Sequence, residues 1–260
     1  MNYLNDALPF LVNCKITEYD IQSGNTSVMR HYKLAPDDVI DKIASLPKEQ
    51  RVVQVGLLQK NNPEFARSLE ASFSAAVNTF LEQNELDQDL DVLCIRRDAV
   101  FVINKPVPKP LIGKDILFRP KHIYHAAIQI ERLHFFFERG EPPKVDHFIQ
   151  ASKDTKGVLE KLQRGMTDFL QEFVELCENT NMDRPKIYQY LAKFASLYKE
   201  KRLEAEYYRE FTRDALFRLR TDEGETFLDE IPDYLVEDLD ISYNYMHIFI
   251  PLCQAVMDGG

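Results

Sequence analysis

The chain has 260 residues, of which 45% are hydrophobic and 28% charged, and its net charge is −10. These values are ordinary for a soluble globular protein with one large domain or two modest ones, and they exclude a disordered chain. The longest apolar runs are too short to span a bilayer, and the N-terminus lacks a basic region followed by an apolar stretch. We therefore expect a cytoplasmic protein with no membrane partner. The four widely spaced cysteines predict buried thiols in a reducing compartment.

Counting charge by segment changes what the acidic total implies. Residues 1–140 carry 17 Lys and Arg against 18 Asp and Glu, whereas residues 141–260 carry 15 against 24. Residues 96–139 hold nine Lys and Arg and only four acids. Because the nearest charges decide the attraction of a phosphate, this basic stripe predicts contact with nucleic acid. Residues 222–240 carry nine acids and no Lys or Arg, which indicates either an acidic loop between helices or a surface for a basic protein partner.

The first half of the chain alternates strand and helix patterns. Residues 10–22 predict a strand that ends in a turn at Asp20, and residues 36–46 predict a short helix that begins at Pro36. Residues 49–59 fit a strand or a buried helix equally well. The apolar spacing of residues 63–83 predicts an amphipathic helix, and residues 91–104 predict a tight hairpin with Asp98 at its tip.

Strand-like sequence continues over residues 115–138, where Phe135, Phe136 and Phe137 are expected to be mainly core residues, because consecutive strand residues point to opposite faces. The Pro- and Gly-containing residues 139–146 predict a boundary, and helical patterns follow near 155–178, 184–219 and 243–257. The expected fold is α+β. Residues 1–140 form an antiparallel sheet with packed helices, and residues 141–260 form a mostly helical domain.

Asp20 and Asp98 each stand at the end of a short apolar strand. An ionised carboxylate in such a place is costly unless it is solvated, paired or bound to a metal. If the two converge, they form a site for a hard cation such as Mg²⁺ or Mn²⁺. Two other interpretations stay open, because aspartate is a common turn residue and because Arg96 or Arg97 could pair with Asp98 and keep a metal away.

These segments resemble the palm domain of template-dependent DNA polymerases. Glu18–Ser27 resembles polymerase motif A, in which an aspartate ends a strand before a turn and a helix. Arg96–Val102 resembles motif C, in which a tight hairpin presents a second metal-binding aspartate. The helix at 63–83 is similar to the one before motif C in family A enzymes. Phe118–Tyr124 resembles the Lys-and-Tyr strand that follows motif C in family B.

The resemblance implies a short polymerase of a phage or mobile-element type, with a role for each matching residue. Asp20 and Asp98 would be the catalytic metal ligands for Mg²⁺ or Mn²⁺. Primer-template and nucleotide contacts would come from residues around them, namely Ser23, Arg51, Lys60, Arg97, Arg119, Lys121 and Tyr124. Lys121 and Arg119 would support the primer phosphates, the backbone around Ser23 the triphosphate, and Arg51 and Lys60 would act as the finger cations.

The sequence also departs from the polymerase pattern. The stretch between the two aspartate motifs is short and has no recognisable fingers signature, and Ala99 follows Asp98 where motif C usually has a second acid. The expected function is polymerase-like nucleotidyl transfer on primed nucleic acid. The alternative is a non-catalytic, palm-derived binding protein, such as a replication accessory or a viral factor, that acts through a protein partner at the acidic C-terminal domain.

Overall fold

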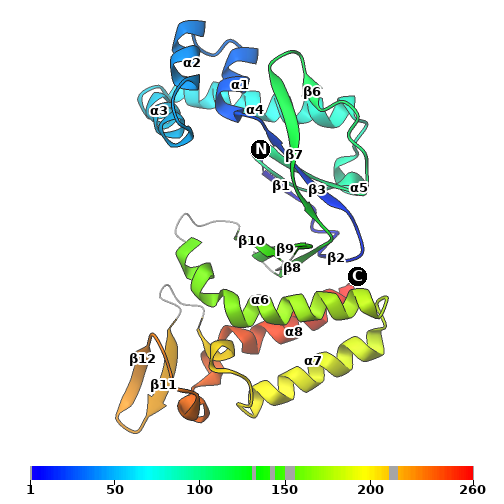
Figure 1. The fold of residues 1–260 in the computed structure, drawn as a ribbon, viewed down its shortest axis with the longest axis vertical. Helices are drawn as coiled ribbons and strands as arrows, with labels where there is room; N and C mark the ends of the chain where they lie inside the picture. The colour runs from blue at the N-terminus through cyan, green and yellow to red at the C-terminus, as the bar shows by residue number, and fades with distance from the viewer. Residues whose placement is uncertain (1, 131–132, 141–143, 150–155, 211–215, 260) are drawn as a thin grey trace. The chain divides into compact units, whose positions relative to one another are not determined.

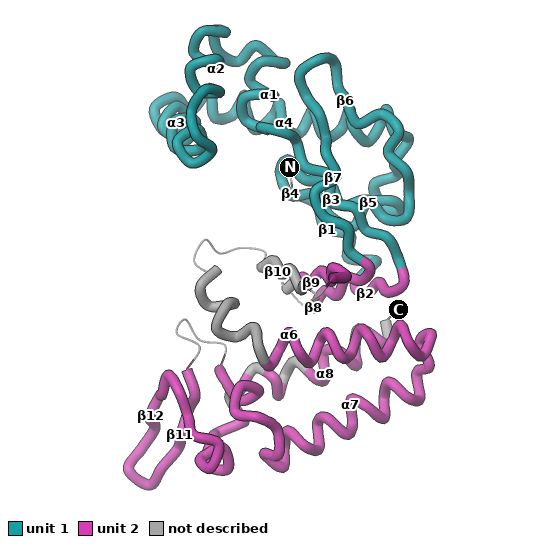
Figure 2. Tube along the Cα trace, viewed as in Figure 1, with its two compact units in different colours: residues 1–8, 14–124 teal, residues 9–13, 125–260 magenta. Residues whose placement is uncertain are grey.

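The computed structural model describes residues 2–130, 133–140, 144–149, 156–210 and 216–259. The chain divides into two compact units: unit 1 is residues 1–8 and 14–124, and unit 2 is residues 9–13 and 125–260 (Figure 2). None of the described helices combines the length and apolar character that crossing a bilayer requires.

Unit 1 is built on a six-stranded sheet in the order β1-β4-β5-β3-β7-β6, and every neighbouring pair is antiparallel. Its strands are β1 (Asn2–Leu4), β3 (Ile16–Ile21), β4 (Val92–Arg96), β5 (Ala99–Ile103), β6 (Leu111–Ile112) and β7 (Ile116–Tyr124). The apolar runs of β4 and β5 are buried along most of their length, as expected for central strands. The predicted hairpin is therefore confirmed, and with it the α+β class with an antiparallel sheet.

Helices α1 to α4 of unit 1 pack next to one another (Figure 1). The helices are α1 (Gly24–His31), α2 (Asp37–Ala44), α3 (Lys48–Asn61), α4 (Pro63–Gln83) and the short α5 (Gln88–Asp91). Helix α4 confirms the prediction for residues 63–83, and the Asn62 side chain caps it by accepting a hydrogen bond from the Phe65 amide at 3.0 Å. The ring of Phe80 on α4 stacks on Phe118 of β7 at 4.1 Å, which anchors the helix to the sheet.

Helix α3 resolves the segment that the sequence left open between strand and helix. Its apolar side chains are spread around the helix, and Val55 is its one buried residue. Val52, Val53 and Leu57 are instead about half exposed. Without a continuous apolar stripe, the periodicity that identifies a helix is lost, which explains why the sequence could not decide.

Unit 2 places helices beside a four-stranded antiparallel sheet of order β10-β9-β8-β2 (Figure 1). Its strands are β2 (Phe10–Leu11), β8 (Ala126–Ile130), β9 (Leu133–Glu138) and β10 (Lys144–Ile149), with a separate hairpin of β11 (Phe217–Thr221) and β12 (Gly224–Leu228). Its α-helices are α6 (Lys156–Asn179), α7 (Arg184–Lys199) and α8 (Tyr245–Gly259), with 3₁₀ turns η1 (Ala205–Tyr208), η2 (Asp233–Asp238) and η3 (Ile241–Tyr243).

The units divide between Tyr124 and His125, earlier than the composition change at 139–146. The reason is the core of unit 2, in which Ala126, Ile128 and Phe135 pack with apolar residues of α6, α7 and α8. Phe135, Phe136 and Phe137 are each at most 2% exposed, so the core prediction for them is confirmed. All four cysteines are free thiols; Cys94, Cys177 and Cys253 are buried, whereas Cys14 is partly exposed.

Two predicted elements are wrong. Residues 10–22 are not one strand, because the backbone at Asn13 takes a left-handed conformation (φ 52°) and divides β2 from β3, which belong to different sheets. The helix predicted over 184–219 ends at Lys199. Lys201 is left-handed (φ 54°), and the Arg202 amide donates to the Leu197 carbonyl, a helix-ending motif in which glycine is usual. No glycine marks this helix end in the sequence, so the helix predicted from the pattern continues beyond the observed end.

Candidate active site

Asp20 lies at the end of β3, next to the tip of the β4–β5 hairpin. It is paired with Ala99 of β5 on one side and with Arg119 of β7 on the other. The amide of the following residue, Ile21, donates to the carbonyl of Asp98 at 3.3 Å. The chain then turns through Ser23, which has a left-handed conformation (φ 52°, ψ 42°), and α1 begins at Gly24. The strand, turn and helix predicted around Asp20 are therefore present, and the backbones of both aspartates meet.

Asp98 occupies a two-residue turn with Arg97, whose φ of 54° is of the kind such hairpin turns require. The Asp98 carboxylate lies against the first residue of α1, because a Cβ added at Gly24 would stand 3.0 Å from Asp98 Oδ2. A larger residue at this position would therefore press on the Asp98 carboxylate, so glycine allows the close approach. The exposed amides at a helix N-terminus favour a negative charge, so this contact suits the carboxylate.

The environment of Asp98 nevertheless makes its ionised form less favourable than that of a solvated aspartate. Burial raises the pKa of Asp98 above its ordinary value, and the nearby Asp20 carboxylate raises it further. The backbone amide of Asp98, Arg97 and Lys121 act in the opposite direction but do not cancel the increase. The two aspartates therefore interact electrostatically, and ionised Asp98 is under-compensated by the protein alone.

Lys121 contacts Asp20 and also a third carboxylate, that of Glu18. Its Nζ lies 3.2 Å from Glu18 Oε1 and 3.5 Å from Asp20 Oδ2. Glu18 and Asp20 are two residues apart on β3 and so share one face of the sheet. Lys121 reaches that face because the β3–β7 register shifts: Tyr19 pairs with Pro120 and Glu18 with His122, which leaves Lys121 as an extra residue in a β-bulge.

A pocket of about 490 Å³ opens beside this cluster. Its lining includes the two aspartates, the turn from Ile21 to Thr26, and four basic residues of which two come from α3 (Lys48 and Arg51) and two from β7 (Arg119 and Lys121). Arg51 Nη1 lies 3.5 Å from the Ser23 hydroxyl, which connects α3 with the turn. The pocket thus has both carboxylates and cations in the lining of one open space, a combination that suits phosphorylated ligands with a bound metal.

Most residues singled out in the sequence line this pocket: Asp20, Ser23, Arg51, Asp98, Arg119 and Lys121. Three others do not line it. Tyr124 lies behind it, where its hydroxyl donates to Glu18 Oε2 at 3.1 Å. Lys60 stands in the last turn of α3, whereas Lys48 and Arg51 stand in the first. Arg97 lies over the ring of Phe73 at 4.5 Å, with its Nε 3.6 Å from Glu70 Oε2.

The position of Arg97 bears on the interpretation that it clamps Asp98. Among the described residues Arg97 forms an ion pair with Glu70, and its positive charge lowers the pKa of Asp98 less than burial and Asp20 raise it. Arg96 lies over the ring of Phe101 at 4.7 Å. The Asp98 carboxylate therefore stays at the pocket wall.

Glu18 and Lys48 are site residues that the sequence reasoning missed. A signal for Glu18 existed, since a strand residue two positions before Asp20 must share its face. Lys48 and Arg51 are three residues apart and adjacent on a helix surface. That relation becomes visible only once residues 49–59 are known to be helical.

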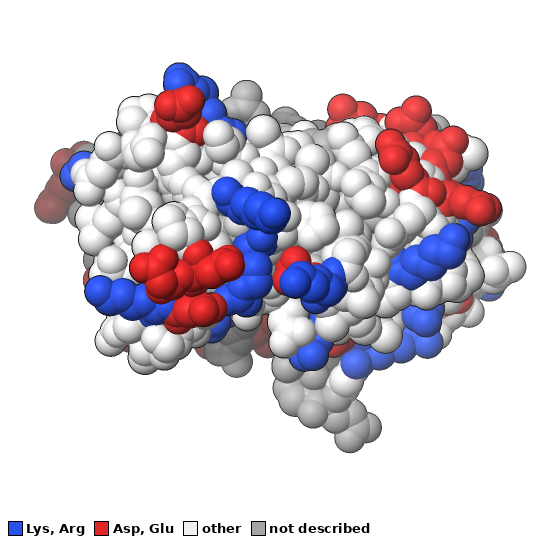
Figure 3. Space-filling model, turned by 90° about the horizontal axis from the view of Figure 1, so that it is seen from above, with Lys and Arg blue, Asp and Glu red and all other residues white. Residues whose placement is uncertain are grey.

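The basic stripe of residues 96–139 does not gather at the pocket as a whole. Arg119 and Lys121 line it, but Lys105 pairs with Asp91 at 2.6 Å and Arg139 with Glu178 at 3.3 Å. Arg132 lies outside the described residues. Acidic and basic side chains are interspersed on the face drawn in Figure 3. Binding of primer-template along this stripe stays a prediction.

The residues present fit a magnesium or manganese ion in one specific way. In the described part of the chain, no group of three or more His, Cys, Asp or Glu side chains is arranged to hold a metal ion. Mg²⁺, however, is often held by one or two carboxylates together with waters and substrate phosphates. Asp20 and Asp98 supply two carboxylates at the wall of an open pocket, so such a site would be completed by its substrate.

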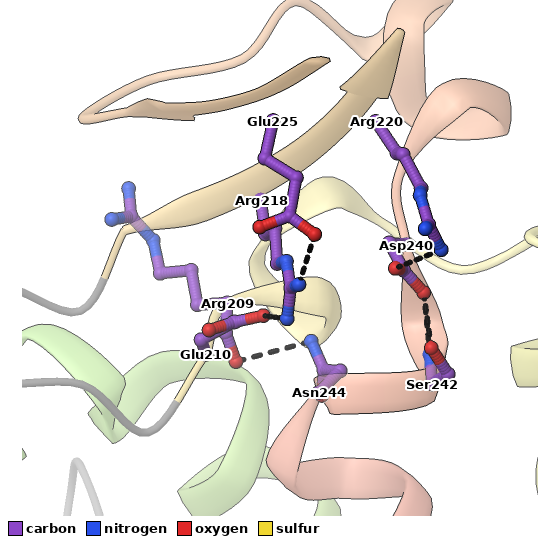
Figure 4. Close-up of polar contacts among 8 residues, drawn as sticks. All are labelled: Arg209, Glu210, Arg218, Arg220, Glu225, Asp240, Ser242 and Asn244. Carbon is purple, nitrogen blue, oxygen red and sulfur yellow. Dashed lines mark hydrogen bonds and ion pairs between the residues drawn. The ribbon is translucent and has the colours of Figure 1, made fainter.

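Unit 2 contains a second cluster of charges, drawn in Figure 4. Arg218 of β11 lies between two carboxylates, with Nη2 2.5 Å from Glu225 Oε1 and Nη1 3.6 Å from Glu210 Oε1. Nearby, Asp240 Oδ1 accepts from the Ser242 amide at 3.0 Å. Asn244 is fully buried, and its side-chain amide donates to the Arg209 carbonyl at 3.1 Å. The Arg218–Glu210 contact connects the β11–β12 hairpin with the segment before it, and Arg220 Nη1, 3.8 Å from Asp240 Oδ2, connects it with the segment after it.

The sequence matches a known protein family over nearly its whole length. Residues 1–256 match the family described as bacteriophage PBS1 gene 130 protein, so the chain belongs to this phage family. No curated protein matches it.

Proposed function

We propose that this member of the PBS1 gene 130 protein family catalyses metal-dependent nucleotidyl transfer on a primed nucleic acid, in the pocket of unit 1. The observation that carries the proposal is the lining of that pocket, which combines Asp20 and Asp98 with four basic side chains. Carboxylates for divalent cations and cations for phosphates are the two components that phosphoryl transfer needs.

Each part of the pocket has a role in this proposal. Asp20 and Asp98 would hold Mg²⁺ or Mn²⁺, which would acidify the primer hydroxyl and neutralise the leaving pyrophosphate. Lys48 and Arg51 would bind the triphosphate from α3, with the backbone amides that follow Ser23. Arg119 and Lys121 would contact primer phosphates from β7. The raised pKa of Asp98 is compatible with this role, because a bound cation favours the ionised carboxylate that burial disfavours.

The test is primer extension by the purified chain with nucleoside triphosphates and Mg²⁺ or Mn²⁺. Asp20→Asn and Asp98→Asn are each expected to lower extension by roughly 100-fold or more, because metal charge stabilisation is worth several kcal/mol. Asp37→Asn, at an exposed acid in the first turn of α2, is the matched control and should leave the rate unchanged. If the wild-type chain extends no primer, or if both site variants retain the wild-type rate, the proposal is wrong.

A second candidate function is a non-catalytic factor that acts through a protein partner, and one observation in unit 2 favours it. Phe227 is 47% exposed and Tyr234 is 79% exposed. Both lie within residues 222–240, which carry nine acids and no basic residue. Exposed aromatic side chains within a charged rim are typical of protein interfaces. Such a surface would suit a basic protein with apolar contact residues.

Capture experiments from lysates of phage-infected cells distinguish this candidate. A protein held by the wild-type chain should be lost with Phe227→Ser and Tyr234→Ser combined. It should be kept with Leu90→Ser, a control at a 73% exposed apolar residue of unit 1. A captured protein that survives the double substitution would rule out this surface as the docking site.

A further inference from the structure

The pocket already contains a positive charge where a cation would be needed. Lys121 Nζ lies between Glu18 Oε1 at 3.2 Å and Asp20 Oδ2 at 3.5 Å. The β-bulge directs this side chain onto the carboxylate face of β3, and Pro120 beside it cannot donate to the sheet. The arrangement is therefore specified by the backbone and does not depend on a chance surface contact.

The two carboxylates that hold Lys121 are not equivalent. Glu18 is a buried residue, and both of its oxygens have partners, since Oε1 accepts from Lys121 and Oε2 from the Tyr124 hydroxyl. Tyr124 is itself buried, and its ring stacks on Phe101. A buried charge in this position needs a permanent partner. Glu18 is therefore fixed in place as the inner partner of the lysine.

Asp20 is the outer partner and can exchange. Its side chain is 33% exposed and lines the pocket, so a cation entering from solvent can reach it. The Lys121 side chain is 51% exposed and has a flexible four-carbon stem. Its contact with Asp20 is also the longer of the two. Loss of the Asp20 contact would thus leave the lysine paired with Glu18.

We propose that Lys121 is an internal counter-ion, which a divalent cation displaces from Asp20 and which Glu18 retains after displacement. This proposal depends on the proposed nucleotidyl-transfer function in one respect, because it takes Asp20 as a metal ligand. Lys121 acts here as a positioning residue, because it sets the charge of the empty site and so the affinity with which a metal binds. A site neutralised in this way holds metal weakly until substrate phosphates supply further ligands.

The test is binding of Mn²⁺ alone to the full chain. Binding is measured as the loss of the free Mn²⁺ signal in electron paramagnetic resonance. Lys121→Met should bind Mn²⁺ at least ~5-fold more tightly than the wild type, because one unit charge at about 4 Å already has an effect of this size in water. Lys121→Arg, which keeps the charge, should bind nearly as the wild type does. Lys114→Met, at an exposed lysine before β7, is the matched control and should not change binding.

Thermal unfolding provides a second measurement that does not depend on activity. Without metal, Lys121→Met leaves Glu18 without its cation, so its Tm should fall below that of the wild type and of Lys114→Met. Added Mn²⁺ should raise the Tm of Lys121→Met more than that of the wild type. A structural role without displacement would instead lower the Tm equally with and without Mn²⁺, and that result would overturn the proposal.

The outcomes separate this proposal from the proposed function. If the wild type binds Mn²⁺ through Asp20 and Lys121→Met binds it no more tightly, displacement is wrong and the nucleotidyl-transfer site survives. If Lys121→Met binds Mn²⁺ but the wild type does not, the lysine blocks the site and is not displaced, so this proposal is wrong, whereas primer extension still decides the proposed function. If neither protein binds Mn²⁺ beyond the level of Asp20→Asn, both proposals fail.

Discussion

In the described part of each unit, a basic side chain is held between two carboxylates, but the surroundings of the two clusters differ. In unit 1, Lys121 is half exposed and lies at a pocket beside Asp98. In unit 2, Arg218 is 12% exposed and connects the β11–β12 hairpin with Glu210 (Figure 4). Arginine forms directed contacts with fixed carboxylates, whereas lysine is a mobile point charge. The comparison indicates a structural cluster in unit 2 and an exchangeable one in unit 1.

The clusters also differ in how far a basic side chain compensates the charge of a buried carboxylate. Burial raises the pKa of Glu210, and Asp240 and Glu225 raise it further, but Arg218, 3.6 Å away, opposes this increase more strongly than the two carboxylates add to it. Burial likewise raises the pKa of Asp98. At Asp98 the next largest contribution comes from a second carboxylate, Asp20, which raises the pKa further. Like charges held together in a cleft are costly for folding and are typical of sites that bind cations. The following predictions test this contrast, from the largest expected effect on stability to the smallest.

Arg218→Met should destabilise the protein most, because it leaves Glu210 and Glu225 facing each other without a cation. Thermal unfolding should show a larger fall in Tm than for any substitution in the pocket of unit 1. Arg220→Met, two residues along the same strand and 67% exposed, is the matched control with a small expected effect. Equal effects of the two substitutions would refute the structural role of Arg218.

Glu18→Gln should have the next largest effect. It removes the charge that holds Lys121, while the Tyr124 hydroxyl keeps an acceptor. Because hydrogen bonds to charged groups are worth about 1.5–3 kcal/mol and Lys121 is half exposed, we expect a loss of about 1–2 kcal/mol in the free energy of unfolding. Urea unfolding measures this. No loss would mean that Lys121 is held by Asp20 alone.

Tyr124→Phe should cost about 1 kcal/mol, since it deletes one neutral donor to Glu18 and keeps the ring stacked on Phe101. The same urea titrations apply. A loss as large as that of Glu18→Gln would show that the tyrosine, and not the lysine, holds the carboxylate in place.

Asp98→Asn should give the smallest effect, and with the opposite sign. Because the pKa of Asp98 is raised in the folded state, stability is lost as the pH rises from the unfolded-state pKa to the higher folded-state pKa. The neutral amide removes this cost, so at pH 7 without metal we expect a gain on the order of 1 kcal/mol or less. The gain should vanish below the unfolded-state pKa of about 3.9, where both proteins are neutral at this position. A loss of stability at pH 7 would contradict the uncompensated charge of Asp98.

Local pattern accounts for the parts of the candidate site that the sequence identified. Asp20 and Asp98 stand at the ends of short β-branched runs, and such runs specify strands and turns by themselves. The helix over residues 63–83 has a proline at its start and a regular apolar stripe, and both are local signals. The sequence therefore placed both aspartates on the correct elements and in the correct order.

The remaining members of the site depend on relations between distant segments. Lys121 faces Glu18 and Asp20 because of a register shift between β3 and β7, which is a relation between two strands far apart in the sequence. Lys48 and Arg51 reach the pocket on a helix whose apolar side chains follow no regular period. Tyr124 supports Glu18 from across the sheet and does not line the pocket.

The sequence by itself determined the β4–β5 hairpin, the turn after Asp20 and the long helix α4, because hydrophobic periodicity and turn chemistry act over a few neighbouring residues. The tertiary structure alone decided which charges meet. It assigned residues 9–13, and the chain from residue 125 onwards, to unit 2, and it brought Lys121 between two carboxylates. It also buried Asp98 beside Asp20. Strand register and desolvation are properties of the folded core, so the two aspartates became a site only when the sheet assembled around them.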